Sequence, residues 1–432
     1  MAGGVSSNHP LRALRHKNFR LFFAGQLISL VGTWMQQVAQ SWLIYRLTHS
    51  ALLLGAIGFA SQIPTFFLGP IGGHVADRYD RRRVLLITQS ASMLLAFILA
   101  GLTLTDLVRE WHLFVLASIL GLVSAFDIPA RQAWLVQLVE REDLINAIAL
   151  NSSMFNGARI VGPAIAGILV ATIGEGWCFF ANAVSYIAVI IGLLMITTPR
   201  FSAQTGRSVW ANIAQGFRFV GTTAPIRALL LLIGAVSFFA LPYTVLMPLF
   251  ADTILHAGAR GLGILMGAAG VGALIGSLTL ASRSTVIGLG RWVAIACATF
   301  GISLSAFALS KSFVLSAALL VIAGGATMVQ MAASNTLIQS MVPDELRGRV
   351  MAVYTMMFVG MGPFGALLAG TIAEHVGAPL TVAGGGAITV LAAIGFGLRL
   401  PSLRGEGRRL IIAQQAAAGE PAQQTTATGA EA

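Results

Sequence analysis

Long stretches without a charged side chain limit what this sequence can fold into more than any other feature does. Residues 21–45, 84–105, 228–251 and 261–282 contain no Asp, Glu, Lys, Arg or His. A helix needs about 20 apolar residues to cross the hydrocarbon core of a bilayer, and each stretch is at least that long. Apolar and polar residues do not alternate along them, as they would in the strands of a membrane β-barrel. The sequence therefore predicts an all-α, polytopic membrane protein.

Twelve long, predominantly apolar stretches occur, in two groups of six. The chain is 56% hydrophobic and only 10% charged, whereas soluble domains carry about 25% charged residues, so lipid must surround most of it. The predicted helices of the first group are 21–45, 51–76, 84–105, 111–139, 144–174 and 176–198, and those of the second group are 228–251, 261–282, 292–310, 312–342, 350–372 and 376–398.

The polar stretches between and after the two groups divide the chain into four parts. Within the middle stretch, helical spacing of apolar residues predicts a short amphipathic helix on the membrane surface, formed by Val209, Ile213, Phe217 and Val220. A disordered linker is the alternative. The final stretch is rich in Ala, Gln, Thr and Gly, a composition typical of disorder. The predicted parts are an N-terminal six-helix bundle with a cytoplasmic N-terminal tail (1–198), a cytoplasmic linker (199–227), a C-terminal six-helix bundle (228–399) and a disordered cytoplasmic tail (400–432).

The basic residues are distributed unevenly over the loops. The formal charge is +11, but the Lys and Arg residues lie in short loops between apolar stretches rather than on one face of a domain, which excludes nucleic acid as a partner. Most of them lie in the two terminal tails and in alternate loops, and the opposite side holds only Arg46, Arg109, Arg260 and Lys311. This bias predicts a multi-pass protein of the bacterial inner (plasma) membrane with both termini in the cytoplasm.

The two groups of helices resemble each other in sequence. Three segments match in the same order along both groups: 121–139 with 324–342, 142–144 with 344–346, and 162–163 with 362–363. Two related six-helix bundles with a binding site between them are typical of secondary transporters.

The loop after the second helix carries the most specific motif. Residues 73–82 read Gly-His-Val-Ala-Asp-Arg-Tyr-Asp-Arg-Arg. They resemble the G-x-x-x-D-R-x-G-R-R signature between helices two and three of the major facilitator superfamily. Asp80 departs from this pattern, which has glycine at that position. Together with the twelve helices, the middle stretch and the repeat, the resemblance extends over most of the chain and implies the major facilitator fold.

The resemblance also implies a gating role for the loop motif, whose residues are Gly73, Asp77, Arg78, Arg81 and Arg82. An unpaired carboxylate at the margin of the membrane is costly, so Asp77 needs a partner. The start of the eleventh helix is a candidate, because a helix N-terminus attracts negative charge. This contact would latch the two halves together when the cytoplasmic side is closed. The alternative is that these charges only set the topology.

Further segments resemble one branch of the superfamily, the enterobactin-exporter-like and macrolide-efflux-like proteins. These segments are 18–22, 126–133, 142–147 and 156–163. The resemblance implies a secondary active transporter that exports small amphipathic molecules, siderophore-like compounds or drugs, by alternating access, with protons as the coupling ion. Import or flipping of a metabolite or lipid is the alternative function. A non-transporting membrane sensor or scaffold is the alternative class, and a monomer is expected.

Three charged residues fall within the predicted helices. Asp127 and Arg131 are one turn apart on the fourth helix and can pair; ionisable residues inside a membrane are rare and usually functional. Asp127 is either a proton carrier or a structural partner of Arg131 or of Arg81 and Arg82, whose charges would hold it ionised. Arg159, on the fifth helix, either binds an anionic substrate or pairs with a carboxylate from another helix, for which Asp127 is a candidate.

Polar and aromatic side chains on helices one, seven and ten are candidates for the substrate cavity, because the resemblance implies that helices one, four, seven and ten line it. Each can also hold helices together. The candidates are Gln36, Gln37, Gln40, Trp42, Tyr243, Gln330 and Asn335. Since proline removes a backbone donor, helices five and eleven are expected to bend at Gly162, Pro163, Gly362 and Pro363.

Enzymatic, nucleotide and metal chemistry are not expected. Cys178 and Cys297 lie far apart in apolar stretches, so neither a disulfide nor a metal site is predicted. The chain has no G-x-x-x-x-G-K-[ST] loop for ATP, and it lacks the paired catalytic side chains that an intramembrane enzyme needs. No cofactor is therefore expected. The expected partners are a small-molecule substrate, protons and the lipid bilayer.

Overall fold

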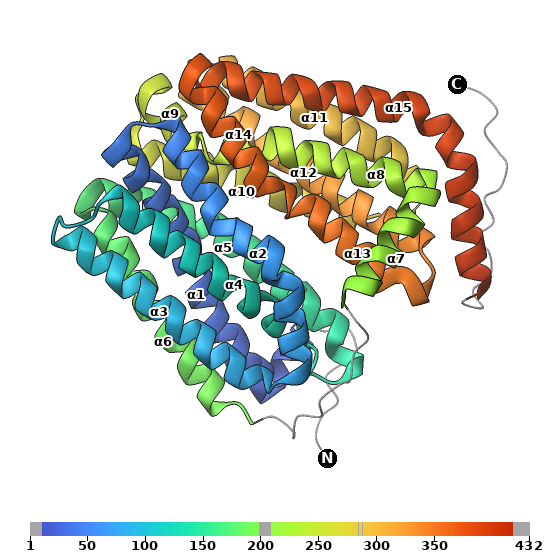
Figure 1. The fold of residues 1–432 in the computed structure, drawn as a ribbon, viewed down its shortest axis with the longest axis horizontal. Coiled ribbons are helices and arrows are strands. Elements are labelled where there is room, and N and C mark those ends of the chain that lie inside the picture. Colours follow the sequence, from blue (N-terminus) through green and yellow to red (C-terminus); the bar gives the residue numbers. More distant parts are fainter. Residues whose placement is uncertain (1–10, 198–208, 284, 287, 418–432) are drawn as a thin grey trace.

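Two helical bundles make up the molecule, as a computed structural model that describes residues 11–197, 209–283, 285–286 and 288–417 shows (Figure 1). No strand occurs within these ranges. The N-terminal bundle contains α1 (Lys17–Thr48), α2 (Ala51–Arg78), α3 (Arg81–Leu104), α4 (Glu110–Leu135), α5 (Leu144–Ile173) and α6 (Glu175–Met195). The C-terminal bundle contains an interrupted segment (Ala224–Ile254), α10 (Gly258–Ala281), α11 (Leu289–Leu309), α12 (Phe313–Met341), α13 (Asp344–Phe358), α14 (Met361–Val376) and α15 (Ala378–Ala417).

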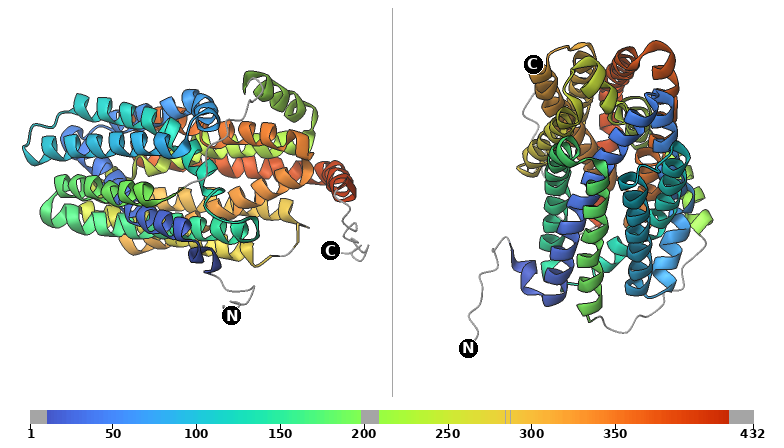
Figure 2. Two further views of the ribbon diagram at one scale, coloured as in Figure 1. Left: turned by 90° about the horizontal axis from the view of Figure 1, so that it is seen from below. Right: turned by 90° about the vertical axis from the view of Figure 1, so that its left-hand side faces the viewer.

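This arrangement confirms the predicted all-α fold of twelve spans. Eleven helical segments within the described residues are long and apolar enough to cross a membrane. The remaining span is α1, which has 32 residues and packs against α5 and α6. Glutamines such as Gln26, Gln36 and Gln37 lower its mean hydropathy. Figure 2 shows the helices of the two bundles running side by side along the molecule.

The two ends of the bundles carry different features. The turn between α2 and α3, at residues 79–80 within the motif of residues 73–82, lies at one end, hereafter the motif end. The turn between α1 and α2, at residues 49–50, lies at the opposite end, hereafter the far end. α7 (Val209–Thr222) and the last turns of α15 lie at the motif end (Figures 1 and 2). α7 occupies the stretch where a surface helix is predicted, whereas residues 198–208 of the predicted linker lie outside the described residues.

The seventh span is an interrupted helix. Pro242 and Pro248 lie within it and cannot donate backbone hydrogen bonds, which accounts for the irregular turns. From start to end it consists of α8 (Ala224–Ala235), the π-helical turn η3 (Val236–Ala240), the 3-10 turn η4 (Leu241–Thr244), α9 (Met247–Leu249) and the π-helical turn η5 (Phe250–Ile254).

The eleventh span is interrupted as well. α13 and α14 are separated at Val359 and Gly360, next to the predicted bend at Gly362 and Pro363. Pro363 stands in the first turn of α14, where a backbone N–H has no partner within the helix. α5, in contrast, is one continuous helix through Pro163.

The last helix is longer than predicted. Residues 400–417 continue α15, so the prediction of a disordered tail from residue 400 is wrong for this part. Residues 418–432 lie outside the described residues. The reason is a set of apolar side chains at helical spacing that pack against the bundle core and stabilise these turns, namely Leu400, Leu403, Leu410 and Ile411. Figure 1 shows α15 changing direction before its end, and Pro401 inside the helix is the expected cause of a kink.

A buried carboxylate ties the N-terminal residues to the bundle at the motif end. Asp143, in η2 (Arg141–Asp143) between α4 and α5, lies 3.0 Å from Arg12 Nε, 2.9 Å from Arg15 Nη2 and 2.7 Å from His16 Nε2. The hydrogen bond with His16 and the charges of Arg15 and Arg12 lower the pKa of the Asp143 carboxyl more than burial raises it. The carboxylate therefore stays ionised and keeps these contacts.

Glycines bring the backbones of the two bundles into contact. α2 of one half packs against α14 of the other, and α5 packs against α10. A Cβ atom on Gly55 would lie 2.5 Å from the Ala366 carbonyl oxygen, and one on Gly263 would lie 2.5 Å from the Pro163 carbonyl oxygen. Side chains cannot fit at these two crossings, so small residues set the spacing between the halves.

Candidate functional site

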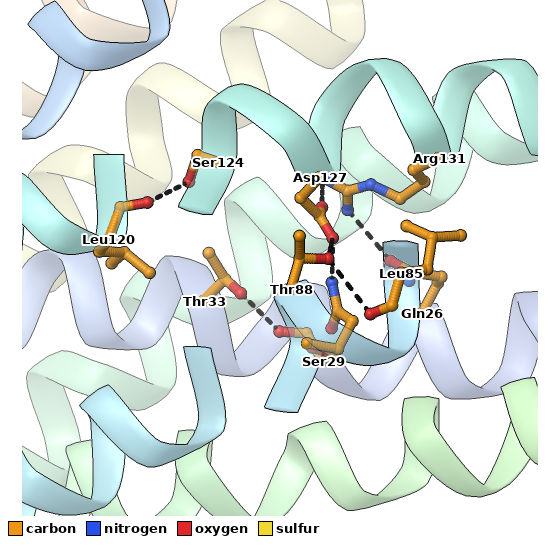
Figure 3. Close-up of polar contacts among 10 residues, drawn as sticks. Gln26, Ser29, Thr33, Leu85, Thr88, Leu120, Ser124, Asp127 and Arg131 are labelled. Atoms are coloured by element: carbon orange, nitrogen blue, oxygen red, sulfur yellow. Dashed lines mark hydrogen bonds and ion pairs between the residues drawn. The ribbon is translucent and has the colours of Figure 1, made fainter. Parts of the chain in front are cut away.

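A buried carboxylate on α4 is the centre of a polar cluster within the N-terminal bundle (Figure 3). Asp127 Oδ1 accepts hydrogen bonds from Thr88 Oγ1 at 2.8 Å and from Gln89 Nε2 at 2.7 Å, both on α3. Arg131 Nη2 lies 3.1 Å from Asp127 Oδ2. Arg131 Nη1 donates to Gln26 Oε1 of α1, also at 3.1 Å. The cluster joins α1, α3 and α4 and compensates a charge that would otherwise be costly to bury.

This geometry favours a structural role for Asp127 over that of a proton carrier. Its side chain is only 9% exposed, and both of its oxygens have partners. The arginines of the motif are directed to backbone carbonyls: Arg82 donates to Leu193 and Leu194 at 2.7 Å each, and Arg81 Nε donates to Ala76 at 3.0 Å. Arg131, one of the candidate partners of Asp127, forms an ion pair with it.

The motif loop is open to its surroundings. The Asp77 side chain is 57% exposed, and Arg81 Nη2 is 3.8 Å from its carboxylate. α13, which begins the eleventh span, packs against the linker helix α7 and against α8 and α14 of its own half. No hydrogen bond or ion pair links Asp77 to α13 among the described residues. The latch that the family resemblance implies is therefore not formed in this conformation.

The remaining motif residues have local roles or open surroundings. The Asp80 side chain accepts a hydrogen bond from the Arg82 backbone N–H at 3.0 Å and caps the start of α3. An aspartate thus caps the helix at the position where the superfamily motif has glycine. Arg78 is exposed, and a Cβ atom on Gly73 would meet nothing within 4 Å.

Two carboxylates of the C-terminal half bind the N-terminal half at the far end. The Tyr45 hydroxyl of α1 donates to Asp252 Oδ2 of η5 at 3.0 Å. Glu374 Oε2 of α14 accepts hydrogen bonds from Ser50 Oγ and from the Leu52 backbone N–H, both at 2.9 Å, and so caps the start of α2. These interactions, hereafter the far-end contacts, close the molecule at this end.

Aromatic packing continues the junction from the far end toward the middle of the molecule. Phe364 of α14 packs against Phe59 and Phe66 of α2, with ring centroids 5.7 and 5.9 Å apart. Phe364 thus extends the contact between α14 and the other bundle, whereas the motif-end latch between Asp77 and α13 is not formed among the described residues.

Arg159 lies at the junction of the two halves, in the middle of α5. Its guanidinium carbon is 5.7 Å from the centroid of the Trp34 ring. A Cβ atom on Gly270 of α10 would lie 3.1 Å from the Arg159 carbonyl oxygen, which places this residue beside the other half. The Tyr243 hydroxyl of the seventh span is within electrostatic range. Within the described residues the guanidinium has no ion pair or hydrogen bond, so Asp127 is not its partner.

The candidates on the first helix divide between the bundle interior and its surface. Gln36 is buried and accepts a hydrogen bond from Asn182 Nδ2 of α6 at 2.7 Å, so it connects helices of one bundle. Gln37 is exposed, and Gln40 and Trp42 are half-buried. Of these four residues, Gln36 has the clearest structural role.

The candidates in the C-terminal half are mostly buried. Tyr243 packs edge to face on Phe300, with centroids 6.3 Å apart. Gln330 is 1% exposed, and neither atom of its amide group has a hydrogen-bond partner. Asn335 is half-buried and accepts a hydrogen bond from Gln339. The amide of Gln330 is therefore a buried polar group whose donors and acceptor remain available.

Gly162 has a packing role beside that of the predicted bend. A Cβ atom there would lie 2.6 Å from Trp34 Cβ and 2.9 Å from the Val31 carbonyl oxygen. Gly162 thus allows α1 to approach α5 and holds Trp34 near Arg159. In α14, Gly362 makes no close approach of this kind, because its nearest atom would be Gln62 Oε1 at 3.7 Å.

Residues 8–416 match the family described as transmembrane secretion effector. The chain belongs to this family of major facilitator superfamily transporters. As a transmembrane secretion effector family member it is a multi-pass membrane transporter and not an enzyme.

Two relatives of this transporter cover nearly the whole chain. This chain is 28% identical over 362 residues to a staphyloferrin A transporter of Staphylococcus aureus (strain NCTC 8325 / PS 47). The matched region covers 83% of this chain and 90% of that protein. It is 28% identical over 388 residues to the enterobactin exporter EntS of Escherichia coli O1:K1 / APEC, which covers 89% of both chains.

Solved structures share the fold of this transporter. The nucleoside transporter NupG is 15% identical, with a TM-score of 0.70, and covers 90% of this chain and 99% of that one. A bacterial homologue of the human lysosomal transporter Spinster, in an inward-facing and occupied conformation, is 14% identical, with a TM-score of 0.70, and covers 92% and 99%.

Several side chains of the transporter's site were not predicted from sequence. Thr88, Gln89 and Gln26 complete the Asp127 cluster, and Tyr45 and Glu374 form far-end contacts. The signal for the last two was a tyrosine and a carboxylate at helix ends that face the same side of the membrane, but many such residues are only solvated.

Proposed function

We propose that this transporter exports small amphipathic anions, of which siderophore-like compounds are the leading class, by proton-driven alternating access. The two relatives named above are a staphyloferrin A transporter and an enterobactin exporter. Iron chelators carry several oxygen donors, and these are anionic or easily ionised when no metal is bound. A transporter for such molecules needs a cation in its central path.

Arg159 is the observation that carries this proposal. It lies in the middle of a span, beside the other half, and it is the intramembrane arginine that has no carboxylate partner within the described residues. An uncompensated charge at that depth is costly, and such residues usually mark a substrate path. An incoming anion would provide the missing partner, with the guanidinium fork binding a carboxylate or a deprotonated hydroxyl pair.

The conformation fits one half of an alternating-access cycle. We place the motif end and both termini in the cytoplasm, on the basis of the loop charges. The far-end contacts then close the outside while the motif end is ready to admit substrate. In the opposite state the far end separates and Asp77 engages the start of α13. The predicted layout of two six-helix bundles, joined by a cytoplasmic linker in a monomer of the inner membrane, belongs to the same proposal.

The test is uptake into inverted membrane vesicles driven by an imposed pH gradient, acid inside. Anionic siderophores and neutral amphipathic drugs of similar size are compared. Arg159→Gln is expected to reduce uptake of the anions by about tenfold or more, equivalent to about 1.4 kcal/mol, because it removes the charge that binds them. Arg159→Lys keeps the charge without the planar guanidinium fork. Its uptake of the anions should therefore lie between that of wild type and that of Arg159→Gln.

Two comparisons keep this test specific. Arg131→Gln serves as the matched intramembrane control, since it breaks the ion pair with Asp127 and should lower the thermal unfolding midpoint, whereas Arg159→Gln should leave the midpoint unchanged. Wild-type uptake of anions by Arg159→Gln, or an equal loss for neutral drugs, would contradict the proposal.

A further inference from the structure

A cavity of about 420 Å³ lies at the motif end of the C-terminal bundle. Its walls come from the starts of α8 and α11, the end of α12, and α15 with its continuation beyond residue 400. These elements belong to one half, so the cavity is separate from the junction where Arg159 lies. Its volume is that of an ordinary ligand site. Apolar side chains dominate the walls, among them Leu229, Leu289, Leu337, Phe396, Leu400 and Ile411.

Three arginines line this cavity, Arg291 at the start of α11 and Arg404 and Arg408 on α15, and none of its described lining residues is acidic. Arg291 and Arg404 are exposed and have no ion pair or hydrogen bond within the part of the chain that the structure describes. Arg404 and Arg408 are one helical turn apart on α15, so an anion near this turn can meet more than one positive charge.

The continuation of α15 is held in place as a wall of the cavity. Gly407 is buried, and a Cβ atom on it would lie 3.4 Å from Met341 Sδ and 3.9 Å from Pro225 Cβ. The helix therefore rests on the ends of α12 and α8 with its apolar side, while its arginines lie at the edge. An apolar face bordered by arginines is typical of helices that lie at the surface of a membrane.

We propose that this cavity binds one anionic phospholipid, with its phosphate group at Arg291, Arg404 and Arg408 and an acyl chain against the apolar wall. A free phosphate ion would contact the arginines but not the apolar wall. A neutral lipid would contact the apolar wall but would not pair with the arginines. Basic pockets between membrane helices on the cytoplasmic side suit anionic headgroups. The assignment of the lipid to the cytoplasmic leaflet rests on the proposed function, because it depends on the proposed orientation of the termini. The rest of this proposal does not depend on it. A lipid bound there would join α15 to α8, α11 and α12.

Lipid binding to the purified full-length transporter in detergent tests this site without any transport step. Phosphatidylglycerol and phosphatidylcholine with the same acyl chains are titrated, and bound lipid is counted by native mass spectrometry. Wild type is expected to bind one phosphatidylglycerol at least tenfold more tightly than phosphatidylcholine. Each basic residue near an anionic headgroup contributes about fivefold, so Arg291→Gln with Arg404→Gln should weaken phosphatidylglycerol binding by about 25-fold.

A matched double variant provides the control. Arg399→Gln with Arg409→Gln removes the same charge from α15 at exposed positions that do not line the cavity, and should change the affinity less than twofold. Arg291→Lys with Arg404→Lys should restore most of the binding, because lysine also pairs with a phosphate. Equal losses in the two Gln double variants would overturn the proposal, as would the absence of a headgroup preference. Displacement of the lipid by inorganic phosphate at millimolar concentration would also overturn it and would identify a site for the free ion.

Discussion

Two charged side chains within the spans have opposite surroundings. Asp127 has a partner on each oxygen, whereas Arg159 lies over the face of Trp34 and has no ion pair or hydrogen bond among the described residues. The spacing of Asp127 and Arg131 by one turn showed that they can pair, but it left Arg81 and Arg82 open as alternative partners. The spacing could not reveal Thr88 or the other donors, because these lie on other helices. The rotation of those helices about their own axes cannot be determined from spacing along the fourth helix. For Arg159 the sequence left two roles open, since only the three-dimensional surroundings show whether a carboxylate is near.

Replacing Asp127 should cost stability rather than proton coupling. Asp127→Asn keeps the volume but removes the ion pair with Arg131, so we expect the free energy of unfolding to fall by about 1–3 kcal/mol while uptake along a pH gradient persists. Thermal unfolding in detergent and vesicle uptake measure the two effects. Asp106→Asn is the control, because Asp106 is exposed and asparagine tolerates its positive φ of 55°. Unchanged stability together with loss of pH-driven uptake would instead identify Asp127 as a proton carrier.

At the scale of elements, the predicted spans agree with the observed helices over most of their length, and the differences have local causes. The seventh span is irregular around two prolines, and the apolar pattern alone did not predict this irregularity. α15 extends beyond residue 400 because its apolar residues pack on the ends of other helices, a contact that composition cannot reveal. How α1 and α5 are spaced likewise depends on one glycine, Gly162.

The approach of α1 to α5 should depend on this glycine. Gly162→Ala places a methyl group against Trp34 Cβ, where a Cβ atom would be 2.6 Å away, and overpacking of this kind costs about 1–3 kcal/mol. Gly157→Ala is the matched control on the same helix, since a Cβ atom there meets nothing within 4 Å, and alanine favours helix by about 0.8–1 kcal/mol. Thermal unfolding should therefore shift in opposite directions for the two variants, and a shift in the same direction would contradict the packing role of Gly162.

The far-end contacts should control how often the two halves separate at that end. Asp252→Ala with Glu374→Ala removes the acceptors for Tyr45, Ser50 and Leu52, so the open far end should become severalfold more populated. Spin labels on cysteines introduced at the far ends of α2 and α14 report the distance distribution. Glu175→Ala is the control, because Glu175 pairs with Arg46 in the same half. A distribution equal to that of wild type would show that these contacts do not hold the far end closed.

For the whole molecule, the apolar stretches, the six-plus-six grouping and the loop motif were sufficient to predict the architecture, and the family match agrees with them. They could not predict which conformation the chain adopts, because either end of two such bundles can carry contacts between the halves. The structure shows one state, with the far end joined and Asp77 without a partner in the other half among the described residues.

Loss of the Asp77 charge should therefore affect transport without affecting the stability of this state. Asp77 is exposed and only 3.8 Å from Arg81, so Asp77→Asn should change the free energy of unfolding by less than about 0.5 kcal/mol. Vesicle uptake should fall, because the opposite state loses its latch. Asp80→Asn in the same loop is the control, since asparagine also caps a helix. Normal uptake by Asp77→Asn would contradict the latch and would indicate that the motif charge only sets the topology.

The glycine crossings between the bundles have a mechanical consequence. Helices whose side chains interlock must disengage each one before they can turn past each other, and this raises the barrier to rotation. At Gly55 and Gly263 the backbones meet without any side chain between them. The proposed separation of the two halves at the far end would therefore not require interlocked side chains to be withdrawn at these two crossings.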